Sequence, residues 1–285
     1  MSKKKRLFID RKGATRCNDV TGLNQILVDL KPKRSLSELY INQKFDVTNL
    51  VKYVEGKKSE DLKITYFHAF TTAVGKLLYL RPLLNRFVSN RRVYEHDDVT
   101  VSFVMKIDFE DKSQEVMVIL PILSNDNIYT ISEKISNKVN SVRSHKDMGS
   151  GANNAIQVLG KLPNIVRVPL VGAFKFLDNK GLLPSSLVQD NIYYSSMIVS
   201  NIGTLKCDGI YHNVTDFGTC SGLITMGEIK KNVINGEEKY FCEFGVTIDE
   251  RIADGFYFIK CLKLLQNIFD NPNVLEENVD EKVEF

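Results

Sequence analysis

Residues 249–255 carry the groups in this chain whose types and spacing are best suited to chemistry. They read D-E-R-I-A-D-G, so two carboxylates, Glu250 and Asp254, lie four positions apart. A carboxylate held in a tight turn can accept a proton from a reacting group if its surroundings make it basic enough. The apolar run 244–248 predicts a strand before this turn, and the run 256–269 predicts a helix after it.

This strand, turn and helix resemble the catalytic signature of two related families, chloramphenicol acetyltransferase and the acyltransferase core of 2-oxoacid dehydrogenase complexes. Those families carry D-H-R-x-x-D-G at this place. The chain keeps Asp249, Arg251, Asp254 and Gly255, but it has Glu250 where the histidine belongs. It looks like a stand-alone branch of the superfamily that lacks the histidine. The resemblance implies an α/β fold, a two-layer α+β sandwich with a mixed sheet flanked by helices.

Three further segments carry the resemblance, which covers residues 30–270. Residues 195–203 look like the family's G-T-F-T-I-S-N-G strand, and the match places Ser196 at the hydroxyl that hydrogen-bonds the oxyanion. Residues 70–85 look like the family's helix that ends in a Pro-x-x-Asn element. Residues 216–227 lie where the family has an Asn-Pro loop and a strand, although the proline is missing here.

In the families, the histidine takes a proton from a thiol or hydroxyl, and a hydroxyl from the neighbouring subunit stabilises the oxyanion. The resemblance therefore implies a CoA-dependent acyltransferase that forms a homotrimer and uses coenzyme A or acyl-CoA as a substrate. It does not identify the acyl group or the acceptor. We expect no lipoyl domain and no metal site in this sequence.

The resemblance also gives roles to single residues. Ser196 would be the oxyanion donor, and Glu250 would take the place of the base. Asp254 would anchor the turn, with Arg34 as its candidate partner, and Gly255 would allow close packing or a special backbone angle. The structural residues of the turn are then Arg251, Gly255 and Arg34.

Glutamate is a weaker base than histidine for deprotonating a thiol. The unperturbed pKa is about 4.3 for Glu, 6.5 for His and 8.5 for a thiol, so the transfer is uphill by about 5.7 kcal/mol for Glu and about 2.7 kcal/mol for His. Burial can narrow the gap by raising the pKa of a carboxyl group. Two interpretations remain open for Glu250. Either it is a retuned base, or it is a structural, hydrogen-bonded or ion-paired carboxylate in an inactive protein that binds acyl-CoA or serves as a trimeric scaffold.

The composition of the 285 residues excludes several classes of protein. A hydrophobic content of 43% is typical of a globular chain, and a net charge of +3 does not favour nucleic-acid binding. No signal peptide or long apolar span is visible, and the five cysteines form no C-x-x-C pair. These features predict a cytoplasmic protein without disulfides or zinc.

Strands and helices alternate irregularly, with an Asn-Gly hairpin signal at 235–236, which predicts a mixed sheet flanked by helices. We expect an N-terminal arm over 1–34, a core domain over 35–272, and a solvated acidic tail over 273–285. The predicted strands cover 39–47, 87–94, 99–109, 115–120, 193–200, 222–229 and 239–248, and the longer predicted helices cover 65–80, 128–142 and 256–269.

An apolar segment, 155–184, interrupts the core domain as an expected helical insertion. It carries four scattered Lys and Arg residues and no acidic residue before Asp178. One interpretation is an arm that binds a membrane surface or a protein partner, or that lines an acyl-chain channel. The interpretation we favour is a structural insertion that packs on its own subunit or across the trimer.

None of the four histidines in the chain has the spacing of a catalytic triad or a metal site. We expect His68 on the surface or in the core of its helix, His212 in a loop, and both His96 and His145 in solvent. The cysteines of the predicted strands, Cys220 and Cys242, are expected to be buried, and Cys207 lies in a predicted turn.

Overall fold

The computed structural model describes residues 10–57, 63–107, 115–144, 158–188 and 191–283. Within this part of the chain, a six-stranded sheet is made of β2 (Glu38–Asp46), β5 (Val99–Lys106), β6 (Glu115–Ile122), β7 (Met197–Asn201), β8 (Gly222–Ile234) and β9 (Glu237–Asp249). Its strand order is β2-β9-β8-β7-β5-β6. The sheet is mixed, because β7 runs parallel to β5 and β8 while the other neighbours are antiparallel.

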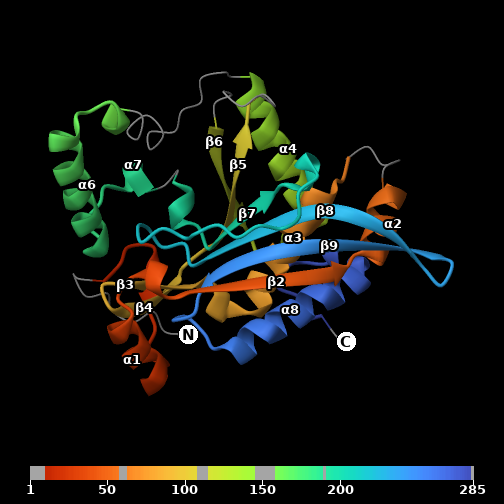
Figure 1. The fold of residues 1–285 in the computed structure, drawn as a ribbon, viewed down its shortest axis with the longest axis horizontal. Coiled ribbons are helices and arrows are strands. Elements are labelled where there is room, and N and C mark those ends of the chain that lie inside the picture. Colours follow the sequence, from red (N-terminus) through yellow and green to blue (C-terminus); the bar gives the residue numbers. More distant parts are fainter. Residues whose placement is uncertain (1–9, 58–62, 108–114, 145–157, 189–190, 284–285) are drawn as a thin grey trace.

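A layer of helices covers one face of this sheet, and Figure 1 shows α8 running along the β2–β9 side. The layer consists of α2 (Thr48–Gly56), α3 (Tyr66–Leu80), α4 (Ile128–Ser144) and α8 (Gly255–Asp270). α3 contacts α2, α4, α8 and β5, and α8 also contacts β2. The predicted two-layer α/β fold with a mixed sheet is therefore confirmed.

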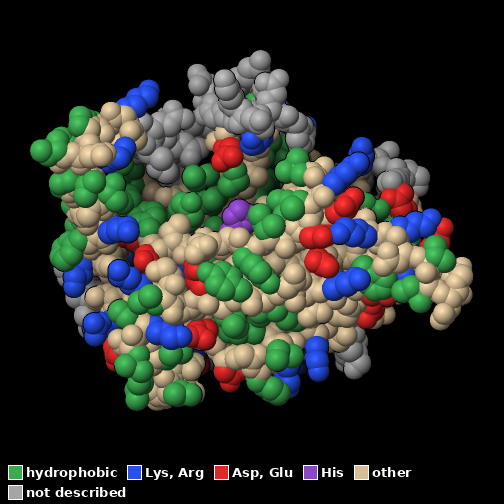
Figure 2. Space-filling model, viewed as in Figure 1, with side chains coloured by type: hydrophobic (Ala, Val, Ile, Leu, Met, Phe, Trp, Pro, Cys, Tyr) green, Lys and Arg blue, Asp and Glu red, His purple; other side chains and the backbone are tan. Residues whose placement is uncertain are grey.

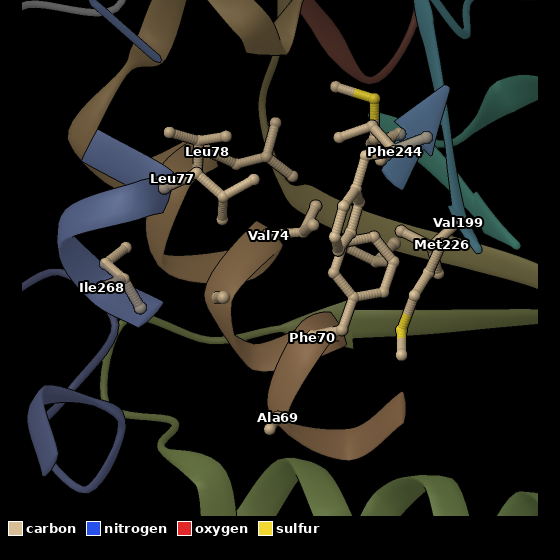
Figure 3. Packing of buried hydrophobic residues seen from close by; sticks show 14 of the residues in the cluster. Ala69, Phe70, Val74, Leu77, Leu78, Val199, Met226, Phe244 and Ile268 are labelled. Atoms are coloured by element: carbon tan, nitrogen blue, oxygen red, sulfur yellow. The ribbon is translucent and has the colours of Figure 1, made fainter. Parts of the chain in front are cut away.

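The main core lies between these two layers. One side of α3 supplies residues at helical spacing, among them Phe70 and Val74, and Figure 3 shows them facing Phe244 of β9. Phe70 and Phe244 join Phe45 and Phe269 in an aromatic group with ring centroids 5.0 to 5.8 Å apart. Such tilted and edge-on contacts add to the stabilisation from apolar burial, so this group ties β2, β9, α3 and α8 together.

A second, smaller sheet lies beside the main one. Its strands, in the order β1-β4-β3, are β1 (Ala14–Arg16), β4 (Arg92–His96) and β3 (Arg86–Ser89), and α1 (Gly22–Leu30) follows β1 in the chain. The stretch expected as an N-terminal arm is thus folded onto the body from residue 10. The single strand predicted over 87–94 is a hairpin instead, because Asn90 and Arg91 adopt left-handed φ angles of 47° and 59° and reverse the chain.

The segment after β7 crosses the sheet in close contact with its backbone. Phe244 and Val246 point to the helices, so Gly245 between them faces the opposite side. A Cβ at Gly245 would lie 2.2 Å from the carbonyl oxygen of Ile210. This approach therefore requires glycine at position 245.

The acidic C-terminal segment packs against the body through apolar side chains, while Glu277, Asp280 and Glu281 are exposed to solvent. Leu275 and Val279 are fully buried, and the Val279 N–H donates to Asp126 O at 2.8 Å. The Lys76 Nζ donates to Asn278 O at 2.8 Å from a buried position on α3. Burial lowers the pKa of Lys76, and the nearby acidic side chains of the segment oppose this effect. The acidic residues thus favour the charged form of a buried lysine.

The predicted insertion carries α6 (Asn164–Asn179) and α7 (Ser185–Val188), which Figure 1 shows at the edge of the molecule away from the helical layer. Most of α6 is exposed, and Asp178 is its buried residue. The expectation that the insertion packs on its own subunit is therefore wrong for most of α6, while packing across subunits stays a prediction. No described helix combines the length and the apolar character needed to cross a bilayer.

Short 3₁₀ turns complete the fold: η1 (Arg34–Leu36), η3 (Pro82–Asn85), η4 (Ile192–Tyr194), η5 (Gly203–Leu205) and η6 (Pro272–Leu275).

Candidate functional site

The D-E-R-I-A-D-G turn joins the last residue of β9 to the first residue of α8. Asp254 is the N-cap of α8, and its carboxylate accepts a hydrogen bond from the Tyr257 N–H at 2.8 Å. Gly255 follows as the first residue of the helix. Its φ angle is not left-handed and an added Cβ would meet no neighbour within 4 Å, so the expected close packing or special angle at Gly255 is wrong.

A buried carboxylate, Asp249, holds the start of the turn. Arg251 donates to Asp249 three times, from its backbone N–H to Oδ1 (3.1 Å), from Nε to Oδ1 (2.8 Å) and from Nη2 to Oδ2 (2.6 Å). Both side chains are almost completely shielded from solvent. This two-pronged contact is the strong, directional form of an arginine–carboxylate pair, and it fixes the backbone on either side of Glu250.

Arg34 faces Asp249 and not Asp254, which corrects the expected pairing. Its Nε lies 3.6 Å from Asp249 Oδ2, and its Nη groups donate to the carbonyls of residues 215, 217 and 218. Asp254 is unsuited to this partner because its carboxylate caps α8. Burial lowers the pKa of Arg34, and the charge of Asp249 opposes that shift. Arg34 thus links the turn to the 215–218 loop.

Glu250, at the position of the missing histidine, forms an ion pair with Lys31. The side chains are 33% and 39% exposed, respectively, so solvent reaches the pair. The Glu250 N–H donates to Ser37 O at 2.9 Å, and Arg251 Nη1 donates to Lys31 O at 2.9 Å. The arginine that anchors the turn therefore also holds the backbone of Lys31 beside Glu250. Sequence reasoning missed Lys31, because only the fold brings position 31 near position 250.

Ser196, the expected oxyanion donor, is buried just before β7. Its Oγ accepts from the Thr100 N–H at 2.9 Å, and its own N–H donates to Thr100 Oγ1 at 3.1 Å. The Ser196 hydroxyl is thus already a structural acceptor between β7 and β5. Within the described part of this single chain, no hydrogen bond or ion pair joins Ser196 to Glu250.

A cavity of about 290 Å³ lies next to Thr100, between the small sheet and the insertion. Its polar walls include Arg11, His96, Asp178 and Tyr194. Asp178 pairs with Arg11 (Nη2 to Oδ1, 2.5 Å) and accepts from the Tyr194 hydroxyl at 2.7 Å. The volume is at the lower end of typical ligand pockets, so within one chain the cavity suits a short acyl or thiol group and not a whole CoA molecule.

His96 lines this cavity and is not the solvated histidine expected from the sequence. Its ring lies 4.6 Å from the ring of Phe87, and its Nε2 is 3.3 Å from Thr219 O. Burial lowers the pKa of His96 to about 4, so the imidazole is neutral near pH 7. His68 is buried in α3, where burial also lowers its pKa to about 4. His212 lies in an exposed loop, and His145 is outside the described residues.

One loop connects the cavity to the turn. The Gly218 carbonyl accepts from Arg34 at 3.1 Å, and the Gly218 N–H donates to Asp178 Oδ2 at 2.9 Å.

Cys220 and Cys242 are buried as predicted, and Cys207 is exposed. In the described part of the chain, no three His, Cys, Asp or Glu side chains are grouped closely enough to hold a metal ion.

Comparisons with known proteins identify this fold but not a family. No family model matches the sequence, and no curated protein is significantly similar to it. A probable dihydrolipoamide acetyltransferase from Listeria monocytogenes matches in structure with a TM-score of 0.57 and 17% identity, over 90% of this chain and 95% of that one. The cubic core of a pyruvate dehydrogenase multienzyme complex gives 0.58 and 11%, over 96% and 99%.

Chloramphenicol acetyltransferase itself gives a TM-score of 0.57 and 11% identity, over 90% of this chain and 99% of that one. The chain therefore has the chloramphenicol acetyltransferase-like fold of acyltransferase catalytic cores, as the sequence predicts. It spans nearly the whole length of each of these three structures.

Proposed function

We propose that this chain is a catalytically inactive protein with an acyltransferase fold, which binds coenzyme A or its thioesters and assembles as a homotrimer. The observation that carries the proposal is the ion pair between Glu250 and Lys31. The position that holds a proton-accepting imidazole in the active families is occupied here by a carboxylate already bound to a cation. The burial of Ser196 supports the proposal. Its contact with Thr100 uses Oγ as an acceptor, so that contact alone does not preclude donation to an oxyanion.

The chemistry of thiol activation argues in the same direction. A carboxylate with an ordinary pKa leaves the proton transfer about 3 kcal/mol further uphill than a histidine does, which is a rate factor of more than 100. Such a deficit can be offset when the carboxylate lies in an apolar, water-free pocket. Glu250 is instead one-third exposed and touches an ammonium group. Its environment thus differs from an apolar, water-free pocket.

The proposed binding of a thioester and the proposed assembly are supported by the contacts of the turn, by the cavity and by the structural neighbours. The Asp249, Arg251 and Arg34 contacts keep the turn in place, and the cavity beside Thr100 offers room for the reactive end of a thioester. Lys12, among the residues that line the cavity, supplies a positive charge that suits a phosphate-bearing ligand, while the charge of Arg11 is offset by Asp178. The cubic core among the structural neighbours supports assembly of this chain into an oligomer.

A second candidate is a CoA-dependent acyltransferase that uses Glu250 as its base and Ser196 as the oxyanion donor. The partial exposure of the Glu250–Lys31 pair favours it, because an exposed ion pair stabilises a protein by only about 0–1 kcal/mol. A ligand could displace Lys31 at little cost, and closure of a subunit interface over the turn would then exclude water from Glu250.

One set of measurements separates the two candidates. Binding of acetyl-CoA is measured by calorimetry, and transfer of its acetyl group to dihydrolipoamide is followed on the parent, Glu250→Gln and Ser196→Ala. Glu243→Gln, which changes a part-exposed carboxylate on β9, the strand that leads into the turn, is the matched control. We expect binding without turnover in every form, and a particle mass of three chains in light scattering. Parent turnover that falls by about 10²–10⁴ in Glu250→Gln, and not in the control, would establish the enzyme instead. Absence of acetyl-CoA binding would remove the binding role.

A further inference from the structure

α6 is attached to the body at one end and otherwise lies free of it. Near its C-terminal end, Asp178 pairs with Arg11, and Phe174 stacks on Phe217 with ring centroids 5.2 Å apart. Toward its N-terminus the helix is exposed, and Figure 1 shows it standing beside the small sheet at the edge of the fold. The helix is thus fixed in place while most of its surface remains available.

The available surface of α6 is apolar. Ile165 is 84% exposed, Val168 is 63% exposed and Phe176 is 61% exposed. Figure 2 shows hydrophobic side chains gathered over this helix at the upper left. Further apolar residues on and beside α6 that are more than one-third exposed are Val158, Val166, Leu170, Val171, Leu177 and Leu182. A contiguous apolar surface of this kind marks a site of contact with a protein or a membrane.

The exposed charges of the segment itself have one sign, although the carboxylate of Asp216, from the 215–218 loop, lies near Lys175. Lys161, Arg167, Lys175 and Lys180 lie between residues 158 and 182. The acidic residue of the same stretch, Asp178, is buried against Arg11 and does not offset them at the surface. The exposed side of the segment therefore combines apolar side chains with four positive charges.

We propose that α6 docks this protein onto the surface of an anionic lipid bilayer. Basic residues beside an apolar helix are attracted to anionic headgroups while the apolar side chains enter the boundary with the acyl chains. The 16 residues of α6 span about 24 Å, less than the hydrocarbon core of about 30 Å, so the helix lies in the interface. Pro169 lies inside α6, where proline commonly causes a kink. The helix has no buried residue at this point, so a kink there is compatible with a helix that lies in the bilayer interface.

The same charges argue against a second copy of α6 as the occupant. Packing two such helices face to face would bring together two sets of four cations, and the segment itself has no exposed carboxylate to offset them. An anionic bilayer satisfies both the apolar surface and the charge. The proposal does not depend on whether the protein transfers acyl groups.

The test is sedimentation of the full chain with phosphatidylcholine vesicles that contain or lack phosphatidylserine. We expect binding at least about tenfold tighter to the anionic vesicles, decreasing as salt is added. The triple variant Ile165→Gln, Val168→Gln and Phe176→Gln should lose this binding. Lys161→Gln, Lys175→Gln and Lys180→Gln combined should abolish the preference for the anionic vesicles.

A matched control carries Leu23→Gln, Leu205→Gln and Val233→Gln, three apolar residues off the insertion that are at least as exposed as Val168. It should bind vesicles like the parent, and circular dichroism should show that all variants are folded. Absence of binding to anionic vesicles, or equal binding by the apolar α6 variant, would overturn the proposal. It would also fail if the particle mass fell in the α6 variant, since the surface would then be an interface between copies of this chain.

Discussion

Replacing Asp249 with asparagine removes the negative charge that lies between the buried guanidinium groups of Arg251 and Arg34. Asparagine has nearly the same shape, so the change isolates charge from packing. It keeps one acceptor oxygen, but its amide nitrogen would face one of the arginine N–H groups that now bind a carboxylate oxygen. Removing one partner of a buried ion pair costs about 3–5 kcal/mol, because the remaining charge is left in a poorly solvating interior.

The neighbouring carboxylate provides the matched control. Glu250→Gln removes a charge one residue away, but its pair with Lys31 is partly exposed and should contribute about 0–1 kcal/mol. The free energy of unfolding of both variants would be measured by urea denaturation at one fixed protein concentration. A loss of several kcal/mol for Asp249→Asn and almost none for Glu250→Gln is expected. Equal losses would refute the assignment of Asp249 as the structural carboxylate of the turn.

Three further predictions concern stability. Asp254→Ala should lower the free energy of unfolding by about 1 kcal/mol through loss of the α8 N-cap, while Asp254→Asn should be close to neutral in the same urea assay. Gly245→Ala should cost about 1–3 kcal/mol, because its Cβ would meet the carbonyl of Ile210, and a neutral effect would contradict the close approach. His68 and His96 have pKa values lowered from 6.5 to about 4, so the unfolded chain binds more protons than the folded one between these values. Stability should therefore fall as the pH drops from about 6.5 toward 4, and urea titrations of a His68→Gln, His96→Gln variant should show a shallower fall.

The elements that sequence predicts well are those specified by neighbouring residues. The helix that became α3 shows apolar residues at helical spacing after Thr65, which accepts from the His68 N–H as its N-cap. The hairpin between β8 and β9 turns at Asn235 and Gly236, with φ angles of 54° and 82°, as the Asn-Gly pair predicts. The β3–β4 hairpin escaped prediction because its turn uses Asn90 and Arg91 without a glycine.

Features that depend on distant residues could not be predicted from local patterns. Val279 reads as part of an acidic tail, yet it is buried in the main core, and its neighbour Asn278 accepts from Lys76, 202 positions away. The same limit applies at the candidate site. The turn at 249–255 was found from its spacing, whereas its contacts with Lys31 and Arg34 depend on how the N-terminal segment packs.

The turn separates the residues that maintain the fold from the residue that would carry the chemistry. Asp249 and Arg251 are buried and bound to each other, and their contacts do not involve the side chain at position 250. The side chain at position 250 can therefore differ without loss of the turn. A carboxylate at position 250 forms an ion pair with Lys31. Arg251 holds the backbone of Lys31 beside it through a hydrogen bond to the Lys31 carbonyl. Placing histidine at 250 alone would put an imidazole against this ammonium group, which disfavours the protonated form that a base must reach. A histidine base at this position would thus require changes at both 250 and 31.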